Sequence, residues 1–113
     1  MKKQFNDKKN YDTALERIMD MECRFDRVQS ALSELQKSVE AYSDVLDDIA
    51  GLDDYYSGDW RSDFSADENG ELPAGLKRGV LSEDGLWNFF EENRELREQM
   101  QDLCDKLKKY DRF

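Results

Sequence analysis

Residues 18–49 read IMDMECRFDRVQSALSELQKSVEAYSDVLDDI, and this stretch decides the fold. Apolar or aromatic side chains recur through it at alternating steps of three and four residues. Counted as heptads, the a positions are Ile18, Phe25, Leu32, Val39 and Leu46, and the d positions are Met21, Val28, Leu35, Tyr42 and Ile49. This repeat is typical of a coiled-coil helix, whose apolar stripe packs on another helix. The stretch therefore predicts a long helix whose partner comes from the same chain, a second copy or another protein.

The ends of this helix are predicted from capping residues. Asp12 or Thr13 can cap its start, although Tyr11 and Ala14 extend the heptad pattern one step further. Gly51 is a typical terminator, so we expect a helix over residues 12–50. The preceding residues 1–11 are then expected to form a basic N-terminal tail, with its positive charge on Lys2, Lys3, Lys8 and Lys9.

A second helix is predicted over residues 82–110. Ser82 can cap it, and two acidic residues follow in the first turn, where they suit the helix dipole. Its heptad positions are Leu86, Phe89, Asn93, Leu96, Met100, Leu103, Leu107 and Tyr110. Because it is shorter than the first helix by about ten residues, an antiparallel hairpin would leave the start of the first helix overhanging. That overhanging apolar end is a candidate dimer surface.

The connector, residues 51–81, is too aromatic for a flexible linker. Ser57 can cap a short helix from Gly58 to Glu68, and Asn69-Gly70 would end it. We therefore predict an all-α protein, a long antiparallel helical hairpin that is coiled-coil-like, with a short helical acidic insert between its two helices. Residues 12–113 are expected to form a single helical domain.

Charge limits the classes of partner. The 113 residues carry a net charge of −10, and residues 51–85 hold nine acidic but only three basic side chains. Acid excess disfavours direct nucleic-acid binding, because phosphate contacts need Lys and Arg. No apolar run reaches the length of a membrane span, and no signal peptide is visible, so we expect a cytoplasmic protein. The two cysteines, Cys23 and Cys104, are expected to stay as free thiols.

Three aspartates in the connector have helical spacing. Asp59, Asp63 and Asp67 stand at i, i+4 and i+8 and would form one carboxylate stripe on a helix. Such a stripe can meet a divalent cation or the basic side chains of a partner. It can equally be a solvated face that is partly neutralised by basic residues of the connector, namely Arg61, Lys77 or Arg78. We expect no metal ligand and no cofactor.

The connector also holds aromatic residues of the types that dominate interfaces. Tyr55, Tyr56 and Trp60 are candidates for a contact hot spot, or alternatively the core of a small domain. The candidate interaction residues are therefore Tyr55, Tyr56, Asp59, Trp60, Asp63 and Asp67.

No catalytic motif is visible. The chain has no histidine, the commonest general base and transition-metal ligand. It has no nucleophile elbow, no phosphate-binding glycine loop and no paired-cysteine zinc signature. We therefore expect a protein that is not an enzyme.

Several sequence blocks carry a family resemblance, and the central ones are not explained by the heptads. The blocks are Glu16-Arg17-Ile18-x-x-Met21-Glu22, Leu52-x-x-Tyr55-Tyr56, Trp60-x-x-Asp63-Phe64, Asp67-x-x-Gly70-x-Leu72-Pro73 and residues 76–84, LKRGVLSED. With these blocks, residues 15–100 resemble a small bacterial family called domain of unknown function 4298. The resemblance implies no activity, substrate or cofactor. It implies that the connector is the distinctive part of the domain, and that the chain has a bacterial or mobile-element origin.

These observations favour a non-catalytic protein–protein interaction or assembly module. Its partner would be an unknown protein or a second copy of itself, as a homodimer, with no direct nucleic-acid partner and no membrane. One alternative is an acidic inhibitor that mimics nucleic acid, which the net charge of −10 suggests. A second alternative is a divalent-cation-binding protein, which the aspartate stripe suggests.

Overall fold

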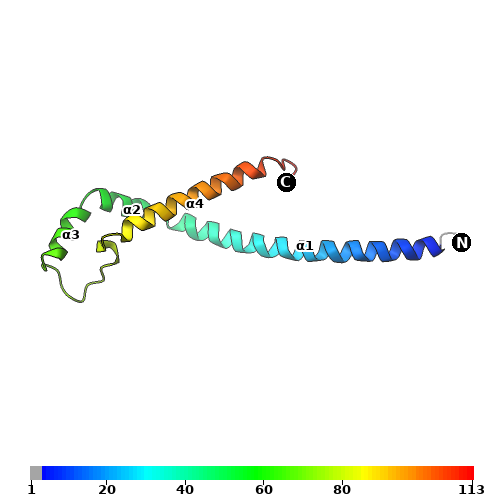
Figure 1. Cartoon of the computed structure of the whole chain (residues 1–113), viewed down its shortest axis with the longest axis horizontal. Coiled ribbons are helices and arrows are strands. Elements are labelled where there is room, and N and C mark those ends of the chain that lie inside the picture. Colours follow the sequence, from blue (N-terminus) through cyan, green and yellow to red (C-terminus); the bar gives the residue numbers. More distant parts are fainter. Residues whose placement is uncertain (1–3) are drawn as a thin grey trace. The chain divides into compact units, whose positions relative to one another are not determined.

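The computed structural model describes residues 4–113, with side chains from residue 9 onward. Over these residues the chain is all-α (Figure 1). Its elements are α1 (Gln4–Asp44), α2 (Leu46–Ser57), α3 (Trp60–Glu68), the short 3₁₀ helix η1 (Gly79–Leu81) and α4 (Gly85–Leu107). The predicted all-α class is confirmed, as is the order of a long helix, a helical insert and a second long helix.

The chain divides into two compact units. The first ends at Leu46 and consists of α1. The second spans Asp47–Phe113 and holds α2, α3, η1 and α4. The prediction of a single domain over residues 12–113 stays a prediction.

Helix α1 begins earlier than its predicted cap at Asp12. It starts at Gln4 and has 41 residues, so its length is about 62 Å. Residues 4–11, predicted as a basic tail, are therefore helical, whereas Lys2 and Lys3 lie outside the described residues. The segment holds no proline or glycine, and glutamine and lysine are good helix formers. With Tyr11 and Ala14 continuing the heptad pattern, nothing in this segment stops the helix.

The predicted end of the first helix at Gly51 is also wrong. The break falls at Val45, whose N–H donates to the carbonyl oxygen of Tyr42 at 3.2 Å, a tight turn that separates α1 from α2. Gly51 lies inside α2. Glycine costs a helix interior about 1 kcal/mol relative to alanine but does not forbid helical geometry. Two apolar side chains that follow it, Leu52 and Tyr56, are half-buried, and Tyr56 packs on Phe90 of α4. Apolar burial of this kind offsets the cost of the glycine.

Helix α3 begins at Trp60, two residues after the predicted start, because Ser57 still belongs to α2 and Gly58 forms a turn. Its predicted end at Asn69-Gly70 is confirmed. The Gly70 N–H donates to the Asp67 carbonyl at 3.0 Å, and the Glu71 N–H donates to the Ala66 carbonyl at 3.0 Å. This is the Schellman pattern, in which the residue after the cap is left-handed. Gly70 has φ of 72°, which glycine adopts without a Cβ clash.

Helix α4 runs from Gly85 to Leu107, so the predicted range 82–110 is too long at both ends. Ser82 is not its cap, because its hydroxyl donates to the carbonyl oxygen of Gly79 at 3.0 Å. That bond closes the turn containing η1, between Gly79 and the start of α4. The two buried apolar side chains of the described residues, Leu81 and Leu86, flank this turn. The core of the second unit therefore lies where η1 meets α4.

Candidate interaction surfaces

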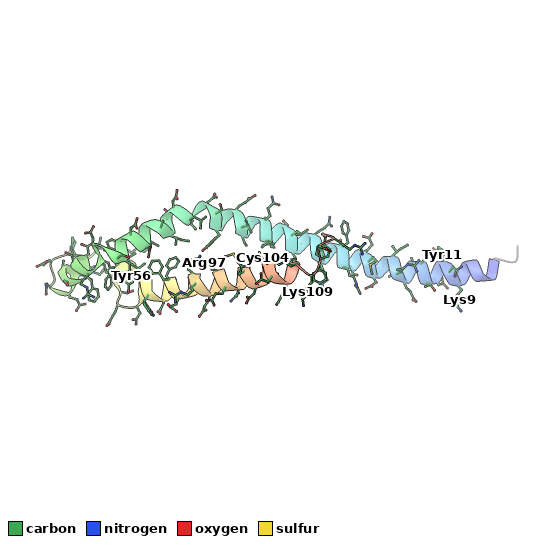
Figure 2. The ribbon with its side chains drawn as sticks, turned by 90° about the horizontal axis from the view of Figure 1, so that it is seen from above. Lys9, Tyr11, Tyr56, Arg97, Cys104 and Lys109 are labelled. Carbon is green, nitrogen blue, oxygen red and sulfur yellow. The ribbon has the colours of Figure 1, made fainter. Side chains whose placement is uncertain are left out.

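An aromatic cluster joins α2, α3 and α4 in the second unit. Tyr56 lies edge-on to Trp60, with ring centroids 5.1 Å apart, and 5.7 Å from Phe90. Trp60 stacks on Phe64 at 4.9 Å, and Phe89 packs against Phe90. Figure 2 labels Tyr56 at this cluster. The structure thus brings the predicted residues Tyr56 and Trp60 together, and both are half-buried. Most of their ring surface is used inside the unit.

A hydrogen bond ties the cluster to η1. The Trp60 indole Nε1–H donates to the carbonyl oxygen of Val80 at 2.7 Å. A tryptophan that is partly buried usually finds such an acceptor for its N–H group. The bond links α3 to the segment before α4, so Trp60 fixes the path of the returning loop.

Tyr55 and Asp63, both predicted interaction residues, contact each other. The Tyr55 hydroxyl donates to Asp63 Oδ2 at 2.7 Å, which links α2 to α3. Desolvation and then the hydrogen bond to Asp63 raise the pKa of Tyr55 to about 12. The negative charges of Asp63 and Asp59 act in the same direction, because they disfavour a tyrosinate nearby. The hydrogen bond and the nearby negative charges therefore favour the protonated hydroxyl of Tyr55.

Arg78 holds the loop between α3 and η1. Its Nε donates to Asp67 Oδ1 at 2.6 Å. Its two terminal nitrogens donate to three backbone carbonyls of the loop, those of Pro73 (2.6 Å), Leu76 (2.8 Å) and Ala74 (3.1 Å). A guanidinium suits this role because it offers five donors in a rigid plane. The sequence indicated Arg78 only as one of three basic residues near the acidic face. The signal that sequence reasoning missed is a loop with one proline and two glycines, residues 70–77, directly before an arginine. Such a loop leaves backbone carbonyls without helical partners, and a guanidinium can bind them.

The three aspartates do not form one shared site. Asp63 accepts from Tyr55, Asp67 pairs with Arg78, and Asp59 is exposed just before α3. Among the side chains that the structure describes, from residue 9 onward, there is no group of three His, Cys, Asp or Glu residues arranged to hold a metal ion. One alternative from the sequence is an acidic face that basic residues of the connector partly neutralise. Asp67 fits that alternative, because its charge is balanced by Arg78.

The heptad stripe of α1 is the largest apolar surface of the first unit. Apart from half-buried Ala14 and Tyr42, every described side chain of α1 is exposed. Seven large apolar side chains at consecutive a and d positions are 47–59% exposed: Ile18, Met21, Phe25, Val28, Leu32, Leu35 and Val39. We call these seven residues the α1 stripe. A continuous apolar surface of this kind marks an interaction site more often than scattered apolar residues do.

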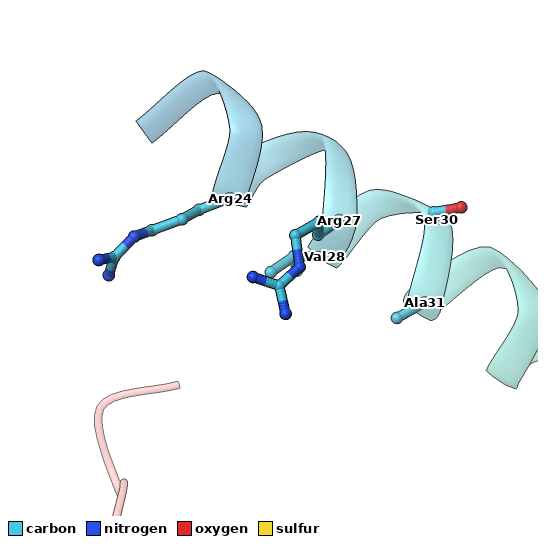
Figure 3. Close-up of a pocket in the computed structure, with 5 residues that line it drawn as sticks. All are labelled: Arg24, Arg27, Val28, Ser30 and Ala31. Carbon is cyan, nitrogen blue, oxygen red and sulfur yellow. The ribbon is translucent and has the colours of Figure 1, made fainter. Parts of the chain in front are cut away.

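A hollow lies beside the stripe on α1. It is lined by Arg24, Arg27, Val28, Ser30 and Ala31 (Figure 3). Val28 belongs to the α1 stripe, Arg24 and Ala31 are g positions at its flank, and Arg27 is a c position further out. Arg24 also forms an exposed ion pair with Asp20 at 3.4 Å. The hollow therefore lies at the edge of the α1 stripe.

Over the described residues the chain is all-α, and α2, α3 and η1 lie in the sequence between the two longest helices, α1 and α4. Residues 18–103 match the family model described as "Domain of unknown function (DUF4298)". The match covers more than half of the chain, so the protein belongs to this family. It confirms the resemblance that the connector motifs indicated.

No curated protein and no solved structure matches the chain. Within the described residues, no helix combines the length and the apolar character that crossing a membrane requires.

Proposed function

We propose that this protein is a non-catalytic interaction module that binds another helix along the α1 stripe. The single observation that carries the proposal is the exposure of seven large apolar side chains in strict heptad order on one helix. Burial of apolar area stabilises an association by about 25 cal/mol per Å² before the costs of ordering are subtracted. A helix is the partner that such a stripe fits, because heptad spacing matches the knobs and holes of a second helix.

The second unit would act as a folded terminus rather than as the binding surface. Tyr56 and Trp60, two predicted hot-spot residues, contact each other and the rest of their cluster. Tyr55 and Asp63 are paired with each other. Because these groups are already engaged, the α1 stripe has more free surface to offer a partner. Of the six candidate interaction residues predicted from the sequence, Asp59 is the one that is exposed.

The proposal also includes a cytoplasmic location and the absence of catalysis. The two free cysteines, Cys23 and Cys104, are exposed, which suits a reducing compartment. The chain has no histidine, so a general base would have to be a carboxylate, lysine, cysteine or tyrosine with an adapted pKa.

Site-specific photocrosslinking tests the proposed surface. A photoreactive benzophenone amino acid replaces Phe25, which belongs to the α1 stripe, or Cys23, at the outward f position. The full chain is expressed in bacterial cells, irradiated, and its adducts are sequenced by mass spectrometry. We expect adducts from position 25, attached within an apolar helical segment, and few from position 23. Equal adducts from both positions, or none from position 25, would contradict the proposed function.

A further inference from the structure

Charged residues flank only one part of the α1 stripe. In the heptad numbering, Arg17 and Arg24 occupy g positions and Glu22 occupies an e position. The later flanking residues are uncharged: Gln29, Ala31, Gln36 and Ser38. Residues at e and g set partner choice and orientation in coiled coils. Charged e and g residues that could set the orientation of a partner helix are therefore found beside the N-terminal part of the α1 stripe and not beside its C-terminal part.

Arg17 and Glu22 are five residues apart, which is the spacing of a g position and the e position of the next heptad. In a parallel, in-register pair of helices these two positions face each other across the interface. In an antiparallel pair, g faces g and e faces e, so like charges or neutral residues would meet. Among the described residues neither Arg17 nor Glu22 has an ion-pair partner within the chain. Their charges are complementary to a parallel second copy.

Helix lengths leave room for such a partner. α1 has 41 residues, whereas α4, the next longest described helix, has 23. No other described helix is therefore long enough to cover α1 over its whole length, whatever the arrangement. Some part of the apolar heptad surface stays available to another molecule.

The area is sufficient for a weak dimer. In the N-terminal part, Tyr11, Ile18, Met21, Phe25 and Val28 are 47–66% exposed, and Leu15 at the flank is 44% exposed. If two copies buried most of this exposed surface, roughly 1,000–1,200 Å² would be removed from water, at the lower end of specific interfaces. This predicts an association that depends on concentration rather than an obligate dimer.

We propose that the occupant is a second copy of this chain, which packs parallel and in register along residues 11–28 of α1. Arg17 of each copy then pairs with Glu22 of the other. This inference rests on the proposed function, and it adds the partner, the orientation and the register.

Charge exchange in the full chain tests the pairing. The variants are Arg17→Glu, Glu22→Arg, an equimolar mixture of the two, and the double exchange in one chain. Lys9→Glu and Glu16→Arg, both at outward f positions, are matched controls. Sedimentation equilibrium at low and high salt, between about 1 µM and 1 mM, covers the range of weak association.

We expect the native chain to dimerise within this range. Each single exchange should weaken the dimer by about ten-fold at low salt, since two attractive exposed pairs become repulsive. The mixture and the double exchange should restore association, because every Arg again faces a Glu. High salt should reduce these differences. Controls should behave as the native chain does.

Two results would overturn the inference. A native chain that stays monomeric up to the highest concentration would exclude a second copy. A dimer whose strength does not depend on residues 17 and 22, or that strengthens on a single exchange, would exclude the parallel register. If crosslinks from position 25 lead to another protein while the native chain stays monomeric, the second copy is wrong and the proposed function still stands.

Discussion

Arg78 and Asp67 lie eleven residues apart in the sequence, and Arg78 Nε approaches Asp67 Oδ1 to 2.6 Å. The same guanidinium binds three loop carbonyls. One side chain thus anchors the loop at the end of α3 and satisfies backbone acceptors that no helix or strand would satisfy. The second unit depends on this contact for the path by which its chain returns from α3 to α4.

Replacing Arg78 by alanine should destabilise the second unit by about 1–3 kcal/mol, because a charge-assisted network is lost. The lower half of this range is expected, since the side chains of Arg78 and Asp67 are 31% and 19% exposed. Urea unfolding followed by tryptophan fluorescence measures the change. Arg61→Ala, an exposed residue of α3 without a hydrogen bond or ion pair to another side chain, is the control. Equal losses for both variants would contradict the role of Arg78.

Trp60→Phe should cost about 1 kcal/mol, since the ring remains but the donor to the Val80 carbonyl is removed. The near-ultraviolet circular dichroism of the aromatic cluster should change as well. Trp87→Phe is the matched control, because Trp87 is 54% exposed. The prediction fails if Trp60→Phe and Trp87→Phe give the same unfolding midpoint.

Replacing Gly85 and replacing Gly51 by alanine should change the stability of the protein in opposite directions. A Cβ at Gly85 would clash with Ser82 Oγ and would lie 2.7 Å from the Gly79 carbonyl oxygen, so Gly85→Ala should destabilise the unit by about 1–3 kcal/mol. A Cβ at Gly51 would have no atom within 4 Å, and the residue is helical. Gly51→Ala should therefore stabilise by about 0.5–1 kcal/mol. The midpoints of thermal unfolding of the two variants, compared with that of the native chain, check both predictions. A stabilised Gly85→Ala variant would show that the turn does not pack as described.

The Tyr55–Asp63 pair should make stability sensitive to alkaline pH. The folded pKa of Tyr55, about 12, lies above its ordinary value of 10.0, so folding favours the protonated hydroxyl. Its contribution to stability is fully present below pH 10 and is lost as the pH rises from about 10 to 12. Absorbance titration of tyrosinate at alkaline pH should show one late step that Tyr55→Phe removes. If Asp63→Asn leaves that step unchanged, the carboxylate is not a cause of the shift.

Local sequence was enough to predict several elements because their causes are local. The heptads around Phe25 predicted the long helix, and Asn69-Gly70 predicted the end of α3, where only the left-handed φ of Gly70 is needed. Predictions failed where a single residue had competing roles. Gly51 is a typical helix terminator, but half-buried apolar neighbours offset the modest cost of a glycine inside α2. Ser82 is a typical helix cap, but its hydroxyl donates to the carbonyl oxygen of Gly79 instead.

The sequence by itself therefore determined that the chain is all-α, which residues form the apolar stripe of α1, and where α3 ends, because periodicity and capping act within a few residues. Only the tertiary structure decided that Arg78 clasps the loop, that Tyr55 pairs with Asp63, and that Trp60 donates to Val80. These contacts join residues 8–20 positions apart, and their partners depend on how the chain returns on itself. No local pattern encodes that path, since the partner of each donor is set by where the chain turns back.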